Sequence, residues 1–245
     1  DSPMYAAAMS GLVRRGSGVL RDASAVNAMD VKDLKNPRAT YFFTSGARPA
    51  APWGRGGVAR GPKNSVILET SNGRWDPMRG DFSESILKLA PKAVRIMDTF
   101  VPSNYAHNLQ KDLSGSASPV VFDFGGKTLI AATQKEGVLR ILDANNLGGD
   151  NHMTPLWQSP RLGNDEETGT DPGRGVWGAI TTYESGGRRF LYIPMHGGNG
   201  KDAPPFPVNQ GATPYGSIMA FEVIQKDGKI SAFPLWQSGM IMSPD

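Results

Sequence analysis

The residues best suited to bind a hard metal ion lie in one acidic run of the chain. This run contains Asp165, Glu166, Glu167 and Asp171, whose carboxylates are ligands that Ca²⁺ accepts. It lacks the alternating oxygen ligands and the fixed glycine of an EF-hand loop. A calcium site and a solvated loop are therefore both open interpretations of this segment.

A softer metal could use two pairs of neighbouring side chains, His152-Met153 and Met195-His196. These ligand types would suit copper if the two pairs met in space. The chain has only three histidines, and the pairs share no spacing, which disfavours such a site. The absence of cysteine excludes disulfides, thiolate ligands and cysteine nucleophiles. The sequence also lacks a glycine-rich phosphate loop, a GxSxG motif and an HExxH motif.

The composition predicts a folded, turn-rich domain. Of the 245 residues, 39% are hydrophobic and 20% are charged, which is ordinary for a globular protein. A formal net charge of +3 with scattered basic residues disfavours nucleic-acid binding, and no apolar run is long enough for a membrane-spanning helix. The 30 glycines and 19 prolines break the chain into short segments, so we expect an all-β fold.

An internal repeat gives the clearest prediction of architecture. The pentapeptide PLWQS occurs at 155–159 and at 234–238, and its Trp follows a glycine-led apolar segment by 20 residues in both copies. Two weaker copies come earlier in the chain, so that the aromatic residues that close the four copies are Phe43, Phe100, Trp157 and Trp236. The spacings between them are 57, 57 and 79 residues. We interpret these aromatic residues as packing anchors between repeats.

Each repeat combines four predicted strands. Short β-rich runs at 65–73, 128–137 and 190–198 stand between a first strand of small residues and the apolar segment that leads to the closing aromatic residue. Four strands in a unit of this length are typical of a β-propeller blade. The predicted division is a partial blade at 1–64 and blades at about 65–115, 116–176 and 177–245, all within a single domain.

One segment has an alternative interpretation. Residues 83–100 could form an amphipathic helix with Ser83 as its N-cap, although Pro91 would then lie in the helix interior. The last repeat contains a proline-rich insert at 195–215, and we expect this insert to be a contact loop for a partner, with Phe206 and Tyr215 as contact residues.

The repeat resembles that of the pyrroloquinoline quinone (PQQ) dehydrogenases and related propellers. The residues that carry the resemblance are a strand that ends in Asp, a turn, and an aromatic residue followed two positions later by Ser, as in 116–143 and 141–160. The resemblance extends from about Met29 to the C-terminus. It implies antiparallel four-stranded blades that form part of a larger propeller of about eight blades, with a closed four-bladed ring as the alternative.

The resemblance also implies candidate site residues. In the PQQ dehydrogenases a calcium-binding Asn precedes a Trp-Asn/Asp-Pro turn, which places that ligand at Asn72, and the catalytic Asp falls at Asp112. Lys111 stands where the family usually has Trp, and the adjacent cysteines of many members are missing. The alternatives are a turn residue before Gly73 for Asn72 and a solvated loop acid for Asp112.

Together these features favour a non-catalytic propeller that works as a binding or assembly subunit without a cofactor. We expect its partners to be proteins that contact the loops or the end faces. The resemblance implies a periplasmic or extracellular location, although the given sequence, which starts at Asp1, has no signal-peptide pattern. The alternative is a PQQ- and calcium-dependent dehydrogenase of alcohols or sugars.

Overall fold

The computed structural model describes the backbone of five strands between residues 4 and 43, and residues 51–239 except 55, 92–94, 116, 164–173 and 211–214. The acidic run with Asp165, Glu166, Glu167 and Asp171 lies outside these residues, as does the side chain of Phe43. The five N-terminal strands make an antiparallel sheet of β1 (Met4–Met9), β4 (Ser24–Met29) and β5 (Ala39–Phe43), and a hairpin of β2 (Val13–Arg15) and β3 (Gly18–Leu20).

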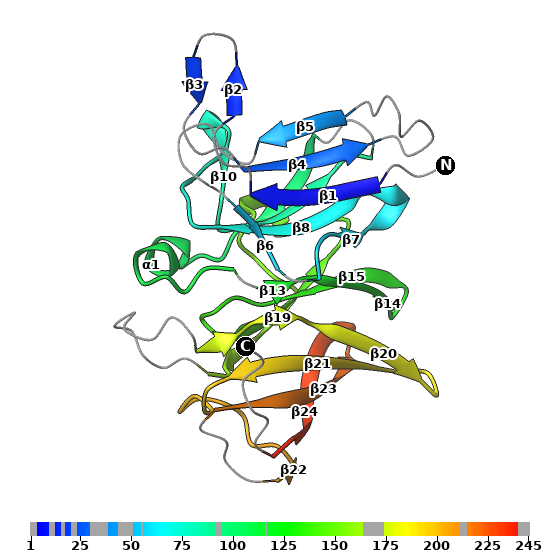
Figure 1. Ribbon diagram of the computed structural model, residues 1–245. Coiled ribbons are helices and arrows are strands. Elements are labelled where there is room, and N and C mark those ends of the chain that lie inside the picture. Colours follow the sequence, from blue (N-terminus) through cyan, green and yellow to red (C-terminus); the bar gives the residue numbers. More distant parts are fainter. Residues whose placement is uncertain are drawn as a thin grey trace.

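Three further antiparallel sheets follow one another along the chain and are stacked in the same order (Figure 1). The first sheet contains β6 (Ala51–Trp53), β7 (Ala59–Arg60), β8 (Val66–Ser71), β11 (Ile86–Leu89) and β12 (Ile96–Phe100). The second contains β14 (Val120–Phe124), β15 (Lys127–Ala132), β16 (Val138–Asp143) and β17 (Trp157–Arg161). The third contains β18 (Gly175–Val176), β20 (Thr181–Ser185), β21 (Arg188–His196), β22 (Val208–Asn209), β23 (Gly216–Lys226) and β24 (Lys229–Gln237).

The predicted all-β fold is confirmed, because helices are short and few among the residues that the structure describes. They are α1 (Tyr105–Gln110) and three 3₁₀ turns at Pro62–Asn64, Pro77–Arg79 and Gly149–Asn151. None of them has the length and the hydrophobicity of a membrane span. Two small strand pairs complete the fold, namely β9 (Trp75–Asp76) with β10 (Asp81–Phe82) and, in parallel, β13 (Ala117–Ser118) with β19 (Gly178–Ala179).

The helical alternative for residues 83–100 is wrong. This segment forms β11 and β12, which pair with each other in antiparallel register, and Pro91 falls in the connection between them. Every residue of β11 is buried, so side chains on both faces of this strand are covered by other parts of the protein. A run of buried residues without alternation cannot be assigned to a helix or a strand by periodicity alone.

The sheets are held together by apolar side chains that alternate between two faces. In β15, Ile130 and Ala132 pack toward the first sheet, whereas Leu129 and Ala131 pack toward the third. Phe100, at the end of β12, lies in the core between the first and second sheets. Trp157, at the start of β17, packs against the core between the second and third sheets. Trp236 is half-buried in β24 beside the ring of Tyr192, with 6.0 Å between the ring centroids.

The first and third sheets begin before the blade boundaries predicted from the sequence. Strands β6 and β7 pair with β8, so the first sheet begins before the predicted boundary at residue 65. In the same way β18 pairs with β21, across the boundary predicted at residue 177. The four-stranded meander predicted for each repeat is clearest in the second sheet, where the order is β14-β15-β16-β17.

The insert at 195–215 is more tightly packed than a free contact loop would be. Phe206 is only 7% exposed and meets Phe221 edge to face, with 5.5 Å between the ring centroids, so it belongs to the core and not to an exposed contact surface. Strand β22 of the insert pairs in parallel with the end of β24. Tyr215, by contrast, is 62% exposed.

We expect Phe206→Ala to lower the free energy of unfolding by about 3 kcal/mol, because it removes a buried aromatic side chain from the core. Urea denaturation of the purified protein would measure this loss. Tyr215→Ala is the matched control and should change stability by no more than about 0.5 kcal/mol. If Phe206→Ala lowers the free energy of unfolding as little as the control is expected to, Phe206 has no packing role.

Candidate functional site

A cluster of polar side chains lies where the first two sheets meet, at the end of β8 and the end of β15. We call it the polar cluster, and its members are Glu69, Glu84, Asn104, Asn108, Asp112, Ser114, Gln134, Lys135, Glu136 and Arg140. Most of these side chains are buried, although their types are usually found at the surface. Buried polar groups need partners, so the contacts within the cluster determine what it can do.

Glu84 links the cluster to the predicted ligand Asn72. It precedes β11 in a left-handed conformation (φ 59°), and its Oε1 accepts a hydrogen bond from the backbone N–H of Asn72 at 2.9 Å. Burial raises the pKa of Glu84 to about 7, although the nearby Ser114 hydroxyl, the backbone N–H groups of the 72–73 turn and the positive charge of Lys135 each lower it. The carboxyl group is therefore partly protonated at neutral pH.

Glu69 follows Ile67 on the face of β8 that meets the second sheet. It is 1% exposed, and the side-chain amide of Gln134 and the backbone of Ala117 lie near its carboxyl group without a hydrogen bond of good geometry. Gly115 packs directly on it, because a Cβ at that position would lie 2.4 Å from the Glu69 Cδ. Burial raises the pKa of Glu69 well above its usual range, and the nearby Glu84 raises it further. Burial thus favours the protonated form of Glu69.

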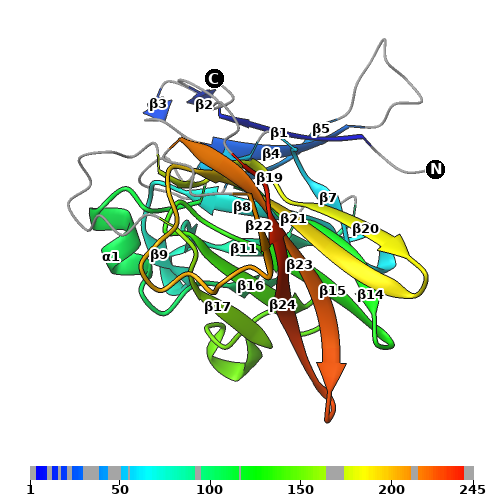
Figure 2. The same ribbon diagram turned by 90° about the horizontal axis from the view of Figure 1, so that it is seen from below.

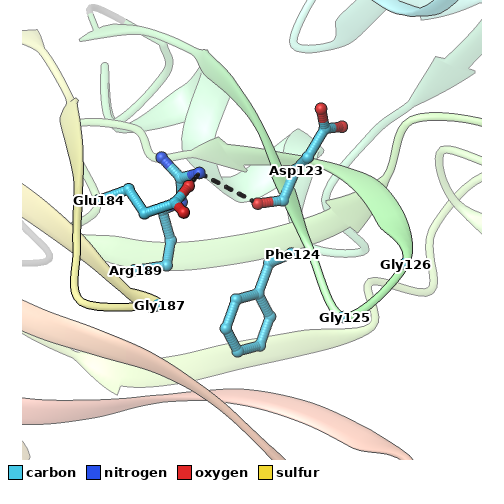
Figure 3. Close-up of a pocket in the computed structure, with 7 residues that line it drawn as sticks. All are labelled: Asp123, Phe124, Gly125, Gly126, Glu184, Gly187 and Arg189. Atoms are coloured by element: carbon cyan, nitrogen blue, oxygen red, sulfur yellow. Dashed lines mark hydrogen bonds and ion pairs between the residues drawn. The ribbon is translucent and has the colours of Figure 1, made fainter.

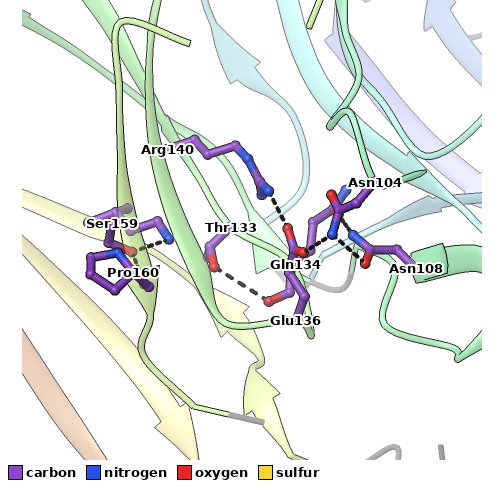
Figure 4. A network of polar contacts seen from close by, with 9 residues as sticks. Asn104, Asn108, Thr133, Gln134, Glu136, Arg140, Ser159 and Pro160 are labelled. Carbon is purple, nitrogen blue, oxygen red and sulfur yellow. Dashed lines mark hydrogen bonds and ion pairs between the residues drawn. The ribbon is translucent and has the colours of Figure 1, made fainter. Parts of the chain in front are cut away.

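Glu136 is the ionised acid of the polar cluster (Figure 4). It is 1% exposed and forms an ion pair with Arg140, and its Oε2 accepts a hydrogen bond from Asn104 Nδ2 at 2.8 Å. Burial by itself would raise the pKa of Glu136, but Arg140 and Asn104 outweigh it and lower the pKa. Asn108 completes this network by donating to Gln134 Oε1 at 3.0 Å.

The structure places the two predicted site residues at the same end of neighbouring sheets. Lys135 Nζ forms an ion pair with Asp112 Oδ1 at 2.6 Å, and Lys135 also acts on the charge of Glu84, which holds the turn of Asn72. Asn72 and Asp112 both adopt left-handed conformations, with φ values of 64° and 53°, and both are exposed. These positions fit a turn residue and a loop acid as well as they fit a site.

The two histidine–methionine pairs have separate surroundings. His152 Nδ1 lies 3.1 Å from the Thr99 carbonyl oxygen, beside the first sheet. Met195 is 4% exposed in the core between the second and third sheets. Over the described part of the chain, no group of three or more His, Asp or Glu side chains could hold a metal ion.

Sequence reasoning missed the buried acids of the polar cluster. A signal was present at Glu69, which stands inside the otherwise apolar and small run VILETS of β8. An ionisable residue in a buried strand is unusual unless it is paired or neutralised. The groups that contact Glu84 come from other segments of the chain, whereas Glu136 has Arg140 four residues away, a local spacing that could have marked this pair.

A concave surface lies between two hairpin turns, Gly125-Gly126 and Gly186-Gly187 (Figure 3). Its volume is about 370 Å³. Arg189 forms an ion pair with Glu184 there and donates to the Asp123 carbonyl oxygen at 3.2 Å. Because Arg189 already has these partners, the pocket does not present a free cation.

We expect the stability of the protein to depend on the protonation of Glu84. The folded-state pKa is raised, so the stabilisation is complete below the usual Glu pKa of 4.5 and is lost as the pH rises through about 7. Relative to Glu84→Gln, the wild type should lose up to about 3 kcal/mol between pH 5 and pH 8. Urea denaturation at several pH values would measure this difference, and parallel curves for the two proteins would contradict it.

The buried pair of Glu136 and Arg140 gives a second prediction. Glu136→Gln should cost about 3 kcal/mol, because it leaves a buried guanidinium without its counter-charge. The double variant Glu136→Gln/Arg140→Met should cost less than the single one, since both charges are then removed. Lys127→Met breaks the exposed pair with Asp143 and should cost no more than about 1 kcal/mol. A double variant that loses as much free energy of unfolding as Glu136→Gln, or more, would contradict a coupled pair.

Comparisons with known proteins do not assign a family. No protein-family model matches the chain, and no curated protein is similar to it. Sixteen chains of solved structures match, among them a mutant of levansucrase from B. subtilis, with 10% identity and a TM-score of 0.36 over 95% of this chain and 72% of that one. A likeness of this size identifies neither a family nor an activity.

Proposed function

We propose that this chain is part of a β-propeller similar to the PQQ dehydrogenases, and that it works as a non-catalytic binding subunit. The stacking of consecutive antiparallel sheets, each built mainly from neighbouring strands of the chain, supports the propeller. The resemblance of the repeats supports the relation to the PQQ dehydrogenases. A protein of that kind acts outside the cytoplasm, so we propose a periplasmic or extracellular location.

The observation that carries the binding role is the pairing of charges inside the polar cluster. Asp112, the candidate base, is bound to Lys135 at 2.6 Å, and Glu136 is bound to Arg140. Glu69 is buried, with its pKa raised by that burial, and Gly115 covers it. A catalytic acid or base must be able to reach the proton of a substrate, which the burial of Glu69 and Glu136 opposes. Asp112 is exposed, but Lys135 occupies one of its carboxylate oxygens. The effect of the two ion pairs is to fix the connection between β15 and β16 and to attach the loop that carries Asp112 to it.

The dehydrogenase remains a second candidate because of one observation. Asn72 and Asp112 lie at the same end of neighbouring sheets, connected through Glu84 and Lys135, as a shared site would require. The fit to PQQ and Ca²⁺ is nevertheless poor. The acid nearest to Asn72 along these contacts is Glu84, whose Oε1 already accepts from the backbone of the same turn. We therefore derive no reaction step through the cofactor.

Reconstitution of the full-length protein with PQQ and Ca²⁺ separates the two candidates. We expect no stoichiometric change in absorbance and no dye-linked oxidation of alcohols or aldoses, under conditions in which a control quinoprotein reconstitutes. Turnover that is abolished by Asp112→Asn and retained by the exposed control Asp202→Asn would overturn the non-catalytic role.

A further inference from the structure

A groove lies between the start of β17 and the hairpin of β23 and β24. It has a volume of about 620 Å³, and we call it the hairpin groove. Its walls include Leu156 and Trp157 of the second sheet and Lys226, Lys229 and Ile230 of the third. Figure 2 shows that the tip of this hairpin projects beyond the neighbouring strands.

Two of the three lysines that line the hairpin groove, Lys226 and Lys229, form no ion pair with a residue that the structure describes. The third, Lys127, pairs with Asp143 at 2.7 Å, and Asp227 also lines the groove. Asp227 and Gly228 form the two-residue turn, both with positive φ, and the turn places Lys226 directly opposite Lys229. Like charges in a cross-strand pair destabilise a hairpin. Neither lysine makes an ion pair with any residue that the structure describes, in contrast to Arg189 and Lys135 elsewhere in the protein.

The groove also offers apolar and backbone contacts. Leu156 is 44% exposed and Trp157 is half-buried beside it, so the second sheet supplies an apolar wall. Strand β24 pairs with β23 along its whole length, but within the described residues β22 covers its outer edge only at Trp236 and Gln237. The edge between Lys229 and Phe233 is thus open to an added strand.

We propose that the hairpin groove binds an extended acidic segment of a partner protein. Carboxylates of such a segment would meet Lys226 and Lys229, an apolar side chain would rest on Leu156 and Trp157, and its backbone would pair with the open edge of β24. This inference rests on the proposed binding function and names the chemistry of the partner. It also moves the contact surface from the insert at 195–215 to the hairpin.

Fluorescence anisotropy of a labelled peptide tests the proposal. The probe is a short peptide that alternates Glu with Leu and Ser, and the matched peptide has Gln in place of Glu. We expect the protein to bind the Glu peptide and not the Gln peptide. Lys226→Glu/Lys229→Glu should weaken binding at least about tenfold, which corresponds to the loss of two charge contacts. Leu156→Ser should weaken it several-fold without loss of folding, because Leu156 is exposed.

The control variant is Lys63→Glu/Arg79→Glu, which makes the same change of net charge at exposed positions of the 3₁₀ turns Pro62–Asn64 and Pro77–Arg79. It should leave the affinity unchanged. Absence of binding to the wild type, or equal weakening by the control, would overturn the proposal. A second result would also overturn the proposal: the Lys226→Glu/Lys229→Glu variant self-associates and the wild type binds no peptide. The two lysines would then serve only to protect the open edge of β24 from pairing with another copy. PQQ-dependent turnover would overturn the proposed function and leave the result for the groove intact.

Discussion

Burial of both faces of the second sheet is the constraint on which the rest of the structure depends. Side chains of β15 alternate between the core shared with the first sheet and the core shared with the third. A sheet covered in this way has its polar backbone paired within the sheet, and any polar side chain near its ends must find a partner in a neighbouring sheet. The polar cluster lies at the ends of β8 and β15, where buried polar side chains need such partners.

The buried acids of the polar cluster are accommodated in two different ways. Glu136 stays ionised because Arg140 and the amide of Asn104 stabilise its charge. At Glu69 burial outweighs the groups that would stabilise the charge, so the pKa is raised and the protonated form is favoured. Glu84 lies between these cases and at the same time holds the turn of Asn72. The same residues that join two sheets thereby fix the two positions that the resemblance to the PQQ dehydrogenases singled out.

The hairpin groove differs from the polar cluster in both exposure and charge. Charged side chains of the cluster are paired inside the protein, whereas Lys226 and Lys229 are exposed and face each other across a turn. Groups that are already paired support packing, and groups left without a counter-charge favour an external ligand. The charge of the projecting hairpin is therefore the basis of the proposed partner contact there, whereas Phe206 of the insert is part of the core.

The all-β class and the repeat could be predicted from the amino-acid sequence, because the spacing of glycine and proline and the recurrence of PLWQS reflect local turn geometry and not distant contacts. The sequence could not decide between helix and strand at 83–100, since every residue of β11 is buried and the alternation that identifies a strand is absent. Nor could it predict that Phe206 is a core residue, which follows from its contact with Phe221 across the third sheet. The pair of Glu136 and Arg140 is local in the chain, but its burial and its proximity to Glu69 and Glu84 come from the tertiary structure, because the pKa values of buried acids depend on packing between segments that are far apart in the chain.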